Sequence, residues 1–340
     1  MVRIGIVGLG FMGRIHYLSA AELVGGEVTA VCSRDALKLD GDWRNTRGNF
    51  GPEPGIVDLA GIKKYSAIAD LLADPDIDLV DICTVTDQHA TIAIAALKAG
   101  KHVLVEKAIS LTTADADAML AAASTAGKLL MVTHVLPFFP EFRFAVNAVR
   151  SGAHGKLIAA HFLRVIAKPD WSADIADTAK TGGPAVDLHI HDTHFIGLLC
   201  GVPNAVFAVG TVSGDAVTYL STSYIYGPGG PAVTCSSGAV CMSGRPFAHG
   251  FEIYLEKATL IYNADKPLTL LTADGMSTQP KLDGGGDPLA AFTAELQTAV
   301  DAVKTGKEPD LLSGKLARDA LALCHRECES VKTGKIVAME

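Results

Sequence analysis

Three glycines near the N-terminus set the strongest limit on how this chain can fold. Gly8, Gly10 and Gly13 form a G-x-G-x-x-G pattern between an apolar, β-branched run and a segment with helical periodicity. In such a unit the first glycine makes a tight turn, the second lets a pyrophosphate approach the backbone, and the third lets helix and strand pack closely. The helix N-terminus then offers free N–H groups to phosphates. The pattern predicts dinucleotide binding; the alternative is a tight turn without a ligand.

Strand-like and helix-like segments alternate through residues 1–133. Alternation of this kind indicates crossover connections and a doubly wound parallel sheet, so we predict a dinucleotide-binding Rossmann domain over these residues. A stretch rich in Gly, Pro, Asp and Asn, residues 41–61, predicts a long surface loop that is functional or mobile. The expected strands are 2–7, 27–32, 78–84, 102–106 and 129–133, and the expected helices are 12–23, 89–99 and 113–126.

The second half, residues 134–340, has a different pattern and predicts a second domain. Several strand-like runs between residues 205 and 271 are separated by turns that contain Gly and Pro, which is typical of an antiparallel meander. We therefore expect an α/β domain with a large open, mainly antiparallel sheet. A strand is expected over 156–167, a polar loop over 168–183, and helices over 142–151, 184–200, 288–305 and 313–333.

Composition excludes several classes of function. Apolar residues make up 49% of the chain and charged residues 19%, which is typical of a globular protein and not of a disordered one. The net charge of −8 argues against general nucleic-acid binding. No apolar run reaches the roughly 18–20 residues of a membrane span. The seven cysteines are odd in number and scattered, which favours reduced thiols. We expect a cytoplasmic protein with neither nucleic-acid nor membrane partners.

The end of the second expected strand bears on the choice of dinucleotide. Units that bind NAD usually carry an acid about 20 residues beyond the glycines, to hold the ribose hydroxyls. Here the strand ends at a cysteine, and Ser33 and Arg34 follow. The planar donor fork of an arginine suits a ribose 2′-phosphate, so these residues favour NADP over NAD. In the alternative, Arg34 is a solvated surface charge and Asp35 takes the ribose of NAD.

Three longer motifs point to one family. Residues 100–107 read GKHVLVEK and resemble A-G-K-H-V-x-x-E-K-P; residues 84–89 read TVTDQH and resemble T-P-x-x-x-H. Residues 182–192 read GGPAVDLHIHD and resemble G-G-G-x-x-x-D-x-x-x-H-D. The order and spacing of all three motifs resemble those of the Gfo/Idh/MocA oxidoreductases, the relatives of glucose–fructose oxidoreductase and inositol dehydrogenase.

The resemblance implies a Rossmann domain followed by a substrate-binding and oligomerisation domain, in a dimer or tetramer. It also implies reversible hydride transfer between NADP or NAD and a hydroxyl of a sugar, inositol or related polyol. Lys107 corresponds to the family's catalytic lysine, and Asp187 and His191 correspond to its substrate-binding and acid/base pair. Two residues depart from the pattern, because Val85 and Ala108 stand where the family has prolines. Loss of a proline removes a constraint on φ, which puts the placement of Lys107 in doubt.

The chemistry of these residue types agrees with the resemblance. Oxidation of an alcohol needs a group that accepts the hydroxyl proton, and histidine does this near neutral pH. An ammonium group such as Lys107 stabilises a developing alkoxide. Asp187 and His191 are four residues apart and would share one face of the expected helix. Taken singly, Lys107 suits a solvated strand end and His191 a buried core position.

Residues expected to bind the cofactor come from the glycine turn, the end of the second strand and two of the motifs. Glu106 is expected to bond the backbone near the cofactor. The expected cofactor contacts are Gly8, Gly10, Phe11, Met12, Gly13, Ser33, Arg34, Thr84, Val85, Thr86, His89, Glu106 and Lys107. The expected substrate contacts are Lys107, His134, Arg164, Trp171, Asp187 and His191.

Other interpretations of the same residues remain open. Asp187, His191 and His194 have the spacing of a metal-binding helix face, and Cys324 and Cys328 flank a histidine, but the chemistry above needs no metal and we expect none. Some relatives hydrolyse glycosides by transient oxidation and reduction without net use of the cofactor. Others are dinucleotide-binding sensors, although the intact catalytic set argues against a sensor here.

Overall fold

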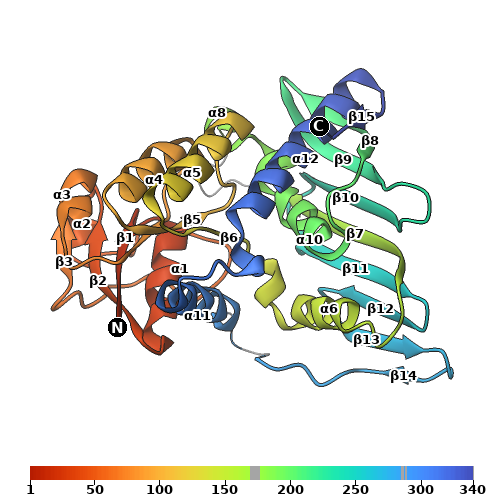
Figure 1. Cartoon of the computed structure of the whole chain (residues 1–340), viewed down its shortest axis with the longest axis horizontal. Coiled ribbons are helices and arrows are strands. Elements are labelled where there is room, and N and C mark those ends of the chain that lie inside the picture. The colour runs from red at the N-terminus through yellow and green to blue at the C-terminus, as the bar shows by residue number, and fades with distance from the viewer. Residues whose placement is uncertain (169–176, 285–286, 288, 340) are drawn as a thin grey trace. The chain divides into compact units, whose positions relative to one another are not determined.

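The computed structural model describes residues 1–168, 177–284, 287 and 289–339. It contains two compact units (Figure 1). The first comprises Met1–Phe138 and Gly286–Arg318, and the second comprises Phe139–Gly285 and Asp319–Glu340. Among the described residues, no helix combines the length and the apolar character that crossing a membrane requires.

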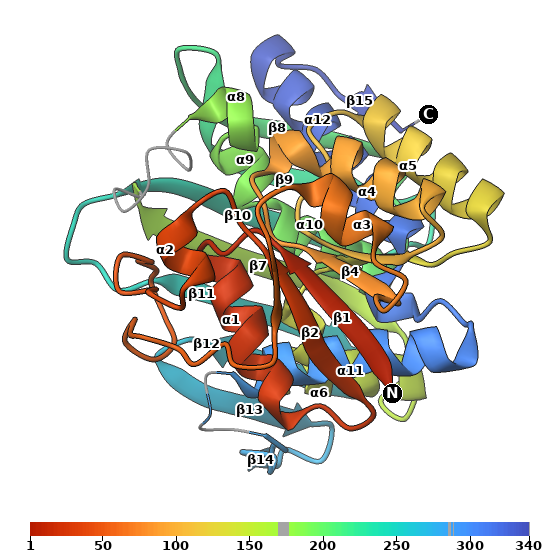
Figure 2. The same ribbon diagram turned by 90° about the vertical axis from the view of Figure 1, so that its left-hand side faces the viewer.

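The first unit is built on a six-stranded parallel sheet in the order β3-β2-β1-β4-β5-β6. This confirms the predicted doubly wound sheet. Figure 2 labels its strands β1, β2 and β4. The strands are β1 (Val2–Val7), β2 (Gly26–Cys32), β3 (Lys63–Tyr65), β4 (Leu79–Ile82), β5 (His102–Glu106) and β6 (Leu130–Thr133). The helices of residues 1–138 are α1 (Phe11–Ser19), η1 (Ala20–Glu22), α2 (Ala36–Leu39), α3 (Ile68–Ala73), η2 (Thr86–Gln88), α4 (His89–Lys98), α5 (Thr113–Ala126) and η3 (Leu136–Phe138).

The central strands of this sheet are buried on both faces, as is usual for a parallel sheet. Every residue of β4 is buried, and so is every residue of β6. Ile4 and Ile6 of β1 are at most 2% exposed. This rigid sheet fixes the positions of the loops that follow each strand.

The predicted loop over residues 41–61 contains no helix and takes part in only an isolated bridge between Asp42 and Ile56. It is anchored, because Trp43 is 1% exposed and its ring meets that of Tyr17 on α1 edge to face at 5.0 Å. Its indole N–H donates to the Lys38 carbonyl at 2.9 Å. The loop therefore packs against the helix that follows the glycine turn.

The boundary between the units differs from the predicted division at residue 134. Helix α11 (Ala290–Thr305) belongs to the first unit although it follows the whole second sheet in the chain. Its Phe292 ring stacks on Phe50 at 5.2 Å, and Thr293 donates to the Ser19 carbonyl at 3.1 Å. Contacts with segments this distant in sequence leave no local pattern, so the return of the chain could not be predicted.

The second unit contains a nine-stranded sheet in the order β14-β13-β12-β11-β7-β10-β9-β8-β15. It is mainly antiparallel, as predicted, but β7 and β10 pair in parallel. The strands are β7 (Leu157–Ala167), β8 (Ala205–Ser213), β9 (Ala216–Ile225), β10 (Ala232–Cys241), β11 (Ala248–Leu255), β12 (Ala258–Asn263), β13 (Lys266–Thr272), β14 (Ser277–Thr278) and β15 (Val337–Ala338). The helices outside residues 1–138 are α6 (Pro140–Ser151), α8 (Thr178–Thr181), α9 (Pro184–Asp187), α10 (Ile190–Cys200), α11, η4 (Asp310–Leu312) and α12 (Gly314–Thr333).

Helices α6 and α10 cover one face of this sheet through an aromatic core. The Phe142 ring meets Phe195 of α10 at 5.1 Å and Phe251 of β11 at 5.2 Å, both edge to face. Ala185 of α9 packs with Leu220 of β9 in a neighbouring cluster. The base on which α9 and α10 rest is therefore rigid and apolar.

The single helix predicted over residues 184–200 is wrong in one respect. The structure has two helices, α9 and α10, separated by a turn at Leu188 and His189. The His189 N–H donates to the Pro184 carbonyl at 3.0 Å, and the His191 N–H donates to the Leu188 carbonyl at 3.4 Å. Asp187 and His191 therefore lie on either side of a turn and not on one regular helix face.

Candidate active site

The glycine turn lies where the strand order of the first sheet reverses. Strand β1 pairs with β2 on one side and with β4 on the other. The Gly8 N–H donates to the Cys32 carbonyl at 2.9 Å, and the Cys83 N–H donates to the Val7 carbonyl at 2.8 Å. Ligands of open α/β sheets bind at such a switch point, beyond the carboxyl ends of the strands.

Each glycine of the turn fits the role that the pattern predicts. Gly8 has a φ of +97°, and a Cβ there would lie 2.8 Å from the Cys83 carbonyl oxygen. A Cβ on Gly13 would collide with the Gly8 carbonyl, so only glycine lets α1 pack this closely. A Cβ on Gly10 would meet nothing within 4 Å. The N-terminus of α1 begins at Gly10 without a side-chain cap. Open space beside uncapped N–H groups fits a dinucleotide pyrophosphate.

Phe11 and Met12, the other predicted cofactor contacts of this turn, occupy the first turn of α1 and are half-buried. The Phe11 ring meets Phe50 of the long loop edge to face at 4.8 Å. Phe11 therefore packs against the long loop and is held in place from that side.

At the end of β2, Arg34 is exposed and makes no hydrogen bond or ion pair within the described part of the chain. Ser33 accepts a hydrogen bond from the Asp35 N–H at 3.1 Å, and the Asp35 carboxylate caps α2 through the Leu37 N–H at 3.0 Å. The nearby Arg44 is already paired with Asp42. Arg34 is thus the cation at this strand end that a ligand can engage.

His89 connects two of the family motifs. Its Nε2 lies 3.0 Å from the Thr84 carbonyl oxygen, and its Nδ1 lies 2.8 Å from the Ala108 carbonyl oxygen. Burial lowers the pKa of His89, so the ring is neutral at neutral pH and can donate to one carbonyl at a time. The predicted cofactor residue His89 therefore holds the loop after β4 against the loop after β5.

The two positions that depart from the family prolines keep defined backbones. Val85 has a φ of −72°, close to the value that proline imposes. The peptide bond between Lys107 and Ala108 is cis. Thr86 is buried at the start of η2. The backbone at Val85 thus has the conformation expected of the missing proline.

Glu106 holds the segment that carries Lys107. Its Oε2 accepts a hydrogen bond from the Lys107 N–H at 3.1 Å, and its Oε1 lies 3.1 Å from Nε2 of His16. Burial opposes ionisation of Glu106, but the hydrogen bond with His16 outweighs burial and lowers the pKa of Glu106. The carboxylate therefore bonds the backbone, as predicted for this residue, and Lys107 itself is half-buried.

A buried cluster that sequence reasoning missed lies beside Glu106. Nδ1 of His16 is 2.9 Å from Oδ2 of Asp81 and 3.3 Å from the Cys83 sulfur. Burial opposes charge on His16, but the Asp81 carboxylate outweighs burial and raises its pKa. Burial raises the pKa of the Cys83 thiol. The ring is therefore a buried imidazolium that lies between two carboxylates, and no sequence spacing links its partners.

Among the described residues, His16, Asp81 and Cys83 form the one group whose donor atoms lie within 4.8 Å of one another, as metal ligands do. Their mutual hydrogen bonds already satisfy them. The alternative metal sets considered from the sequence do not form such a group within the described part of the chain. His194 is fully buried, and burial lowers its pKa to about 3. All seven cysteines are free thiols.

Asp187 and His191 belong to the second unit, and both are half-buried. The residues between and after them point inward, since His189, Ile190 and Asp192 are at most 1% exposed. The predicted pair is therefore held on a short, tightly anchored segment, while Lys107 belongs to the first unit.

Arg164 has a different surrounding from the one expected of a substrate contact. Its Nε and Nη2 donate to the two carboxylate oxygens of Asp192 at 2.7 and 3.0 Å. Both side chains are at most 4% exposed, and the guanidinium carbon lies 5.6 Å from the Phe247 ring centre. A buried, bidentate pair directly after His191 therefore anchors α10 to β7.

Two further residues, His134 and Trp171, are predicted to contact the substrate. His134 follows β6 in the first unit and is 1% exposed. Trp171 lies outside the described residues.

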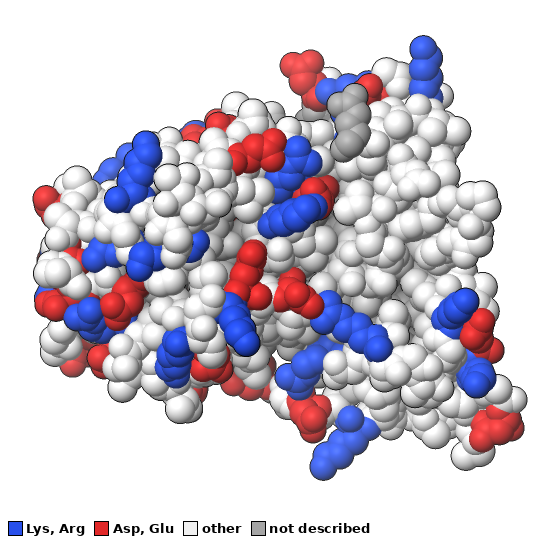
Figure 3. Space-filling model, in the orientation of Figure 1, with Lys and Arg blue, Asp and Glu red and all other residues white. Residues whose placement is uncertain are grey.

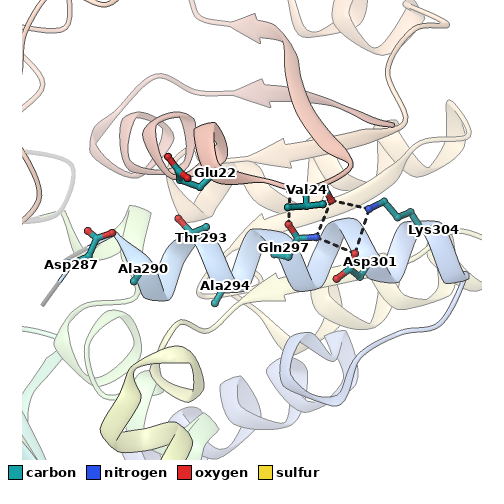
Figure 4. A pocket seen from close by; sticks show the side chains of 9 residues that line it. All are labelled: Glu22, Val24, Asp287, Ala290, Thr293, Ala294, Gln297, Asp301 and Lys304. Carbon is teal, nitrogen blue, oxygen red and sulfur yellow. Dashed lines mark hydrogen bonds and ion pairs between the residues drawn. The ribbon is translucent and has the colours of Figure 1, made fainter. Parts of the chain in front are cut away.

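A groove of about 610 Å³ lies elsewhere in the first unit, between η1 and α11 (Figure 4). There Gln297 and Lys304 donate to the Val24 carbonyl at 3.1 and 2.9 Å, and the lining contains no predicted site residue.

Comparison with known proteins identifies the first unit. Residues 2–134 match the Gfo/Idh/MocA family, described as an oxidoreductase family with an NAD-binding Rossmann fold. The matched segment contains the glycine turn, residues 84–89 and the strand end at Lys107. The dinucleotide-binding unit of the chain therefore belongs to the Gfo/Idh/MocA oxidoreductase family. The chain is an NAD(P)-dependent oxidoreductase, and its Rossmann unit binds the dinucleotide.

Two curated relatives match the chain along most of its length. The 1,5-anhydro-D-fructose reductase of Ensifer adhaerens is 28% identical over 91% of this chain and 92% of its own. The myo-inositol 2-dehydrogenase of Thermotoga maritima is 27% identical over 100% and 99%. A levoglucosan dehydrogenase in complex with NADH and levoglucosan has a TM-score of 0.85 at 19% identity, covering 99% of each chain, which shows a shared fold.

Proposed function

We propose that the chain is a dehydrogenase or reductase that transfers a hydride between NAD(P) and the CH–OH group of a sugar, an inositol or a related polyol. The observation that carries this proposal is the position of Lys107, which follows the buried Glu106 at the same edge of the sheet as the glycine turn. The names of the full-length relatives, an anhydrofructose reductase and an inositol dehydrogenase, support the substrate class.

In the proposed mechanism each side chain of the set has one task. Nε2 or Nδ1 of His191 accepts the proton of the substrate hydroxyl during oxidation and returns it during reduction. The Lys107 ammonium stabilises the negative charge that develops on the same oxygen. The Asp187 carboxylate accepts a hydrogen bond from a neighbouring hydroxyl and orients the substrate. The bound nicotinamide supplies or accepts the hydride.

We favour NADP as the cofactor. The exposed Arg34 has no partner within the described residues, and Ser33 lies beside it with a hydroxyl. Asp35, the candidate for the ribose of NAD, uses its carboxylate to cap α2. A free guanidinium next to an occupied carboxylate suits a 2′-phosphate better than a 2′-hydroxyl.

We also propose a dimer or tetramer formed through the open face of the nine-stranded sheet. The strands alternate, so that residues flanking buried positions point to the side away from α6 and α10. Figure 3 shows few charged side chains over β8–β11. An apolar sheet face of this kind is commonly buried by a partner, here a second copy. The outward side chains include Phe207, Val209, Val240 and Tyr254, which are 37–55% exposed.

The test is nicotinamide absorbance with the purified protein, each oxidised cofactor, and a panel of inositols, sugars and sugar acids. A rising signal with one substrate is expected, and substitution of Lys107→Met or His191→Asn should abolish it while NAD(P) binding is retained. Full turnover in either variant contradicts the assignment. Release of an aglycone from glycosides without added cofactor would instead favour internal redox chemistry.

A further inference from the structure

A buried ion pair anchors the turn between α9 and α10. Nε2 of His189 lies 2.8 Å from Oε2 of Glu327 on α12, and both side chains are fully buried. Nδ1 of the same ring lies 2.5 Å from the Ser237 hydroxyl on β10, and the Tyr224 hydroxyl on β9 is 3.4 Å from Nε2. Residues of α12, β10 and β9, which are distant in sequence, therefore all lie next to the His189 ring.

The surroundings of this ring determine its charge. Burial opposes a positive charge on His189, but the Glu327 carboxylate outweighs burial and raises the pKa of His189. Asp192 acts in the same direction, and Arg164 acts against it. The Cys235 sulfur, 3.9 Å from Nδ1, completes the groups that face the ring. The Glu327 carboxylate therefore favours the charged form of His189, in which Nε2 faces Glu327 and Nδ1 faces Ser237.

The backbone of His189 transmits this anchoring to its neighbours. Its N–H donates to the Pro184 carbonyl at 3.0 Å, which closes α9. Its carbonyl accepts the N–H groups of Asp192 and Thr193, both at 3.1 Å, which opens α10. A displacement of the His189 backbone would thus move the last residue of α9 and the first turn of α10 together. Those are the positions of Asp187 and His191.

We propose that Glu327 is a positioning residue for His191 and that it acts through His189. The proposal rests on the proposed function, in which His191 transfers the substrate proton. With Glu327 in place, His191 stands between two anchored residues, His189 and the Arg164-bound Asp192. Proton transfer depends steeply on such placement, since a shift of about 1 Å at a reacting group can reduce the rate about 100-fold.

The test replaces Glu327 by its neutral isostere. Glu327→Gln is expected to lower kcat by about 10- to 100-fold. Because the dinucleotide unit is untouched, the Kd for NAD(P) should not change. Glu329→Gln is the matched control, since Glu329 lies on the same helix, its side chain is 49% exposed, and its ion pair among the described residues is with Arg326. That control should leave kcat and Kd at their original values.

The pH dependence separates positioning from a general structural defect. Without the Glu327 carboxylate, burial lowers the pKa of His189, so the variant holds a neutral ring where the native protein holds a charged one. The kcat deficit of Glu327→Gln should therefore shrink as pH rises through the raised pKa of His189 in the native protein, above which both proteins hold a neutral ring. A deficit that is constant with pH would overturn the proposal, and so would an unchanged kcat. If Glu327→Gln fails to fold, Ser237→Ala, which removes the partner of Nδ1, should show a smaller deficit with the same pH trend.

A double substitution identifies the route of the effect. In a His191→Asn background, Glu327→Gln should cause no further loss of residual turnover, since the residue it positions is absent. A further loss equal to that in the native background would overturn the proposal. If His191→Asn itself keeps full turnover, the proposed function fails. If His191→Asn is inactive and Glu327→Gln is fully active, only the role of Glu327 fails.

Discussion

Nε2 of His16 lies 3.1 Å from Oε1 of Glu106, the carboxylate that also bonds the backbone N–H of Lys107. The other ring nitrogen of His16 faces Asp81. One buried imidazolium thus connects α1, which follows the glycine turn, to β4 and to the end of β5. Helix α11 closes this cluster with a further acid, Glu295, which is fully buried and has no hydrogen-bond partner for either carboxylate oxygen within the described residues.

Glu295 should make stability fall as pH rises. Burial and the neighbouring Glu106 raise its pKa well above the ordinary 4.5, so the folded protein keeps a proton that the unfolded chain releases. The native state then loses up to about 1.4 kcal/mol per pH unit between these two pKa values. Glu295→Gln should therefore be more stable than the native protein at neutral pH and gain little near pH 4.5. Urea unfolding across this range measures the difference, and equal slopes for the two proteins would contradict it.

Two glycines of the turn should respond differently to the same substitution. A Cβ at Gly10 enters open space at a φ of −78°, so Gly10→Ala should fold normally but weaken NAD(P) binding by about 10-fold or more. A Cβ at Gly13 collides with the Gly8 carbonyl, so Gly13→Ala should lose about 1–3 kcal/mol of stability. Thermal unfolding and cofactor fluorescence titration check both. Normal NAD(P) affinity in Gly10→Ala would place the pyrophosphate elsewhere.

Arg34 should discriminate between the two cofactors. Arg34→Ala removes a charge-assisted contact to a 2′-phosphate and should weaken NADP binding by about 10-fold while leaving NAD binding unchanged. Arg44→Ala is the control, because the Arg44 guanidinium is already bound by Asp42. Calorimetric titration with each cofactor gives the comparison. An equal effect of Arg34→Ala on both cofactors would remove the argument for NADP.

The buried Arg164–Asp192 pair should matter far more for stability than a surface pair. Asp192→Ala leaves the guanidinium buried without its carboxylate and should cost about 3–5 kcal/mol of unfolding free energy. Asp117→Ala breaks the pair with Arg318, in which the aspartate is 54% exposed, and should cost less than about 1 kcal/mol. Urea denaturation measures both values. Similar losses for the two variants would show that burial does not decide the strength of these pairs.

Local rules explain the parts of the fold that could be predicted from the sequence. Helix α5 runs over Thr113–Ala126 as predicted, because the Thr112 hydroxyl accepts the Asp115 N–H at its start and Gly127 adopts a φ of +61° at its end. The strand His102–Glu106 is likewise a continuous apolar run between polar residues. In each case the signal lies within a few residues of the boundary.

The rest depends on contacts that no local pattern records. The turn at Leu188 and His189 exists where a histidine is held by Glu327, which lies far along the chain. In the sequence, Arg164 is a polar residue on an expected strand. Only the packing of α10 against β7 shows that its guanidinium donates to the Asp192 carboxylate. The His16 cluster joins three elements in the same way. The sequence shows the residue types, but only the structure shows which residue each of them contacts. Those contacts distinguish the candidate site residues from the residues that hold them in place.

Each unit combines two segments that are distant in sequence, which affects how the protein folds during its synthesis. A nascent protein emerges N-terminus first, and the dinucleotide unit obtains its last helix only from Gly286–Arg318. Until then the rings of Phe50 and His16 lack their contact with Phe292 of α11. The second unit is completed later still, by Asp319–Glu340. Neither unit is a continuous stretch, so a gene fragment that ends before residue 286 encodes a nucleotide-binding sheet without the helix whose Phe292 stacks on Phe50.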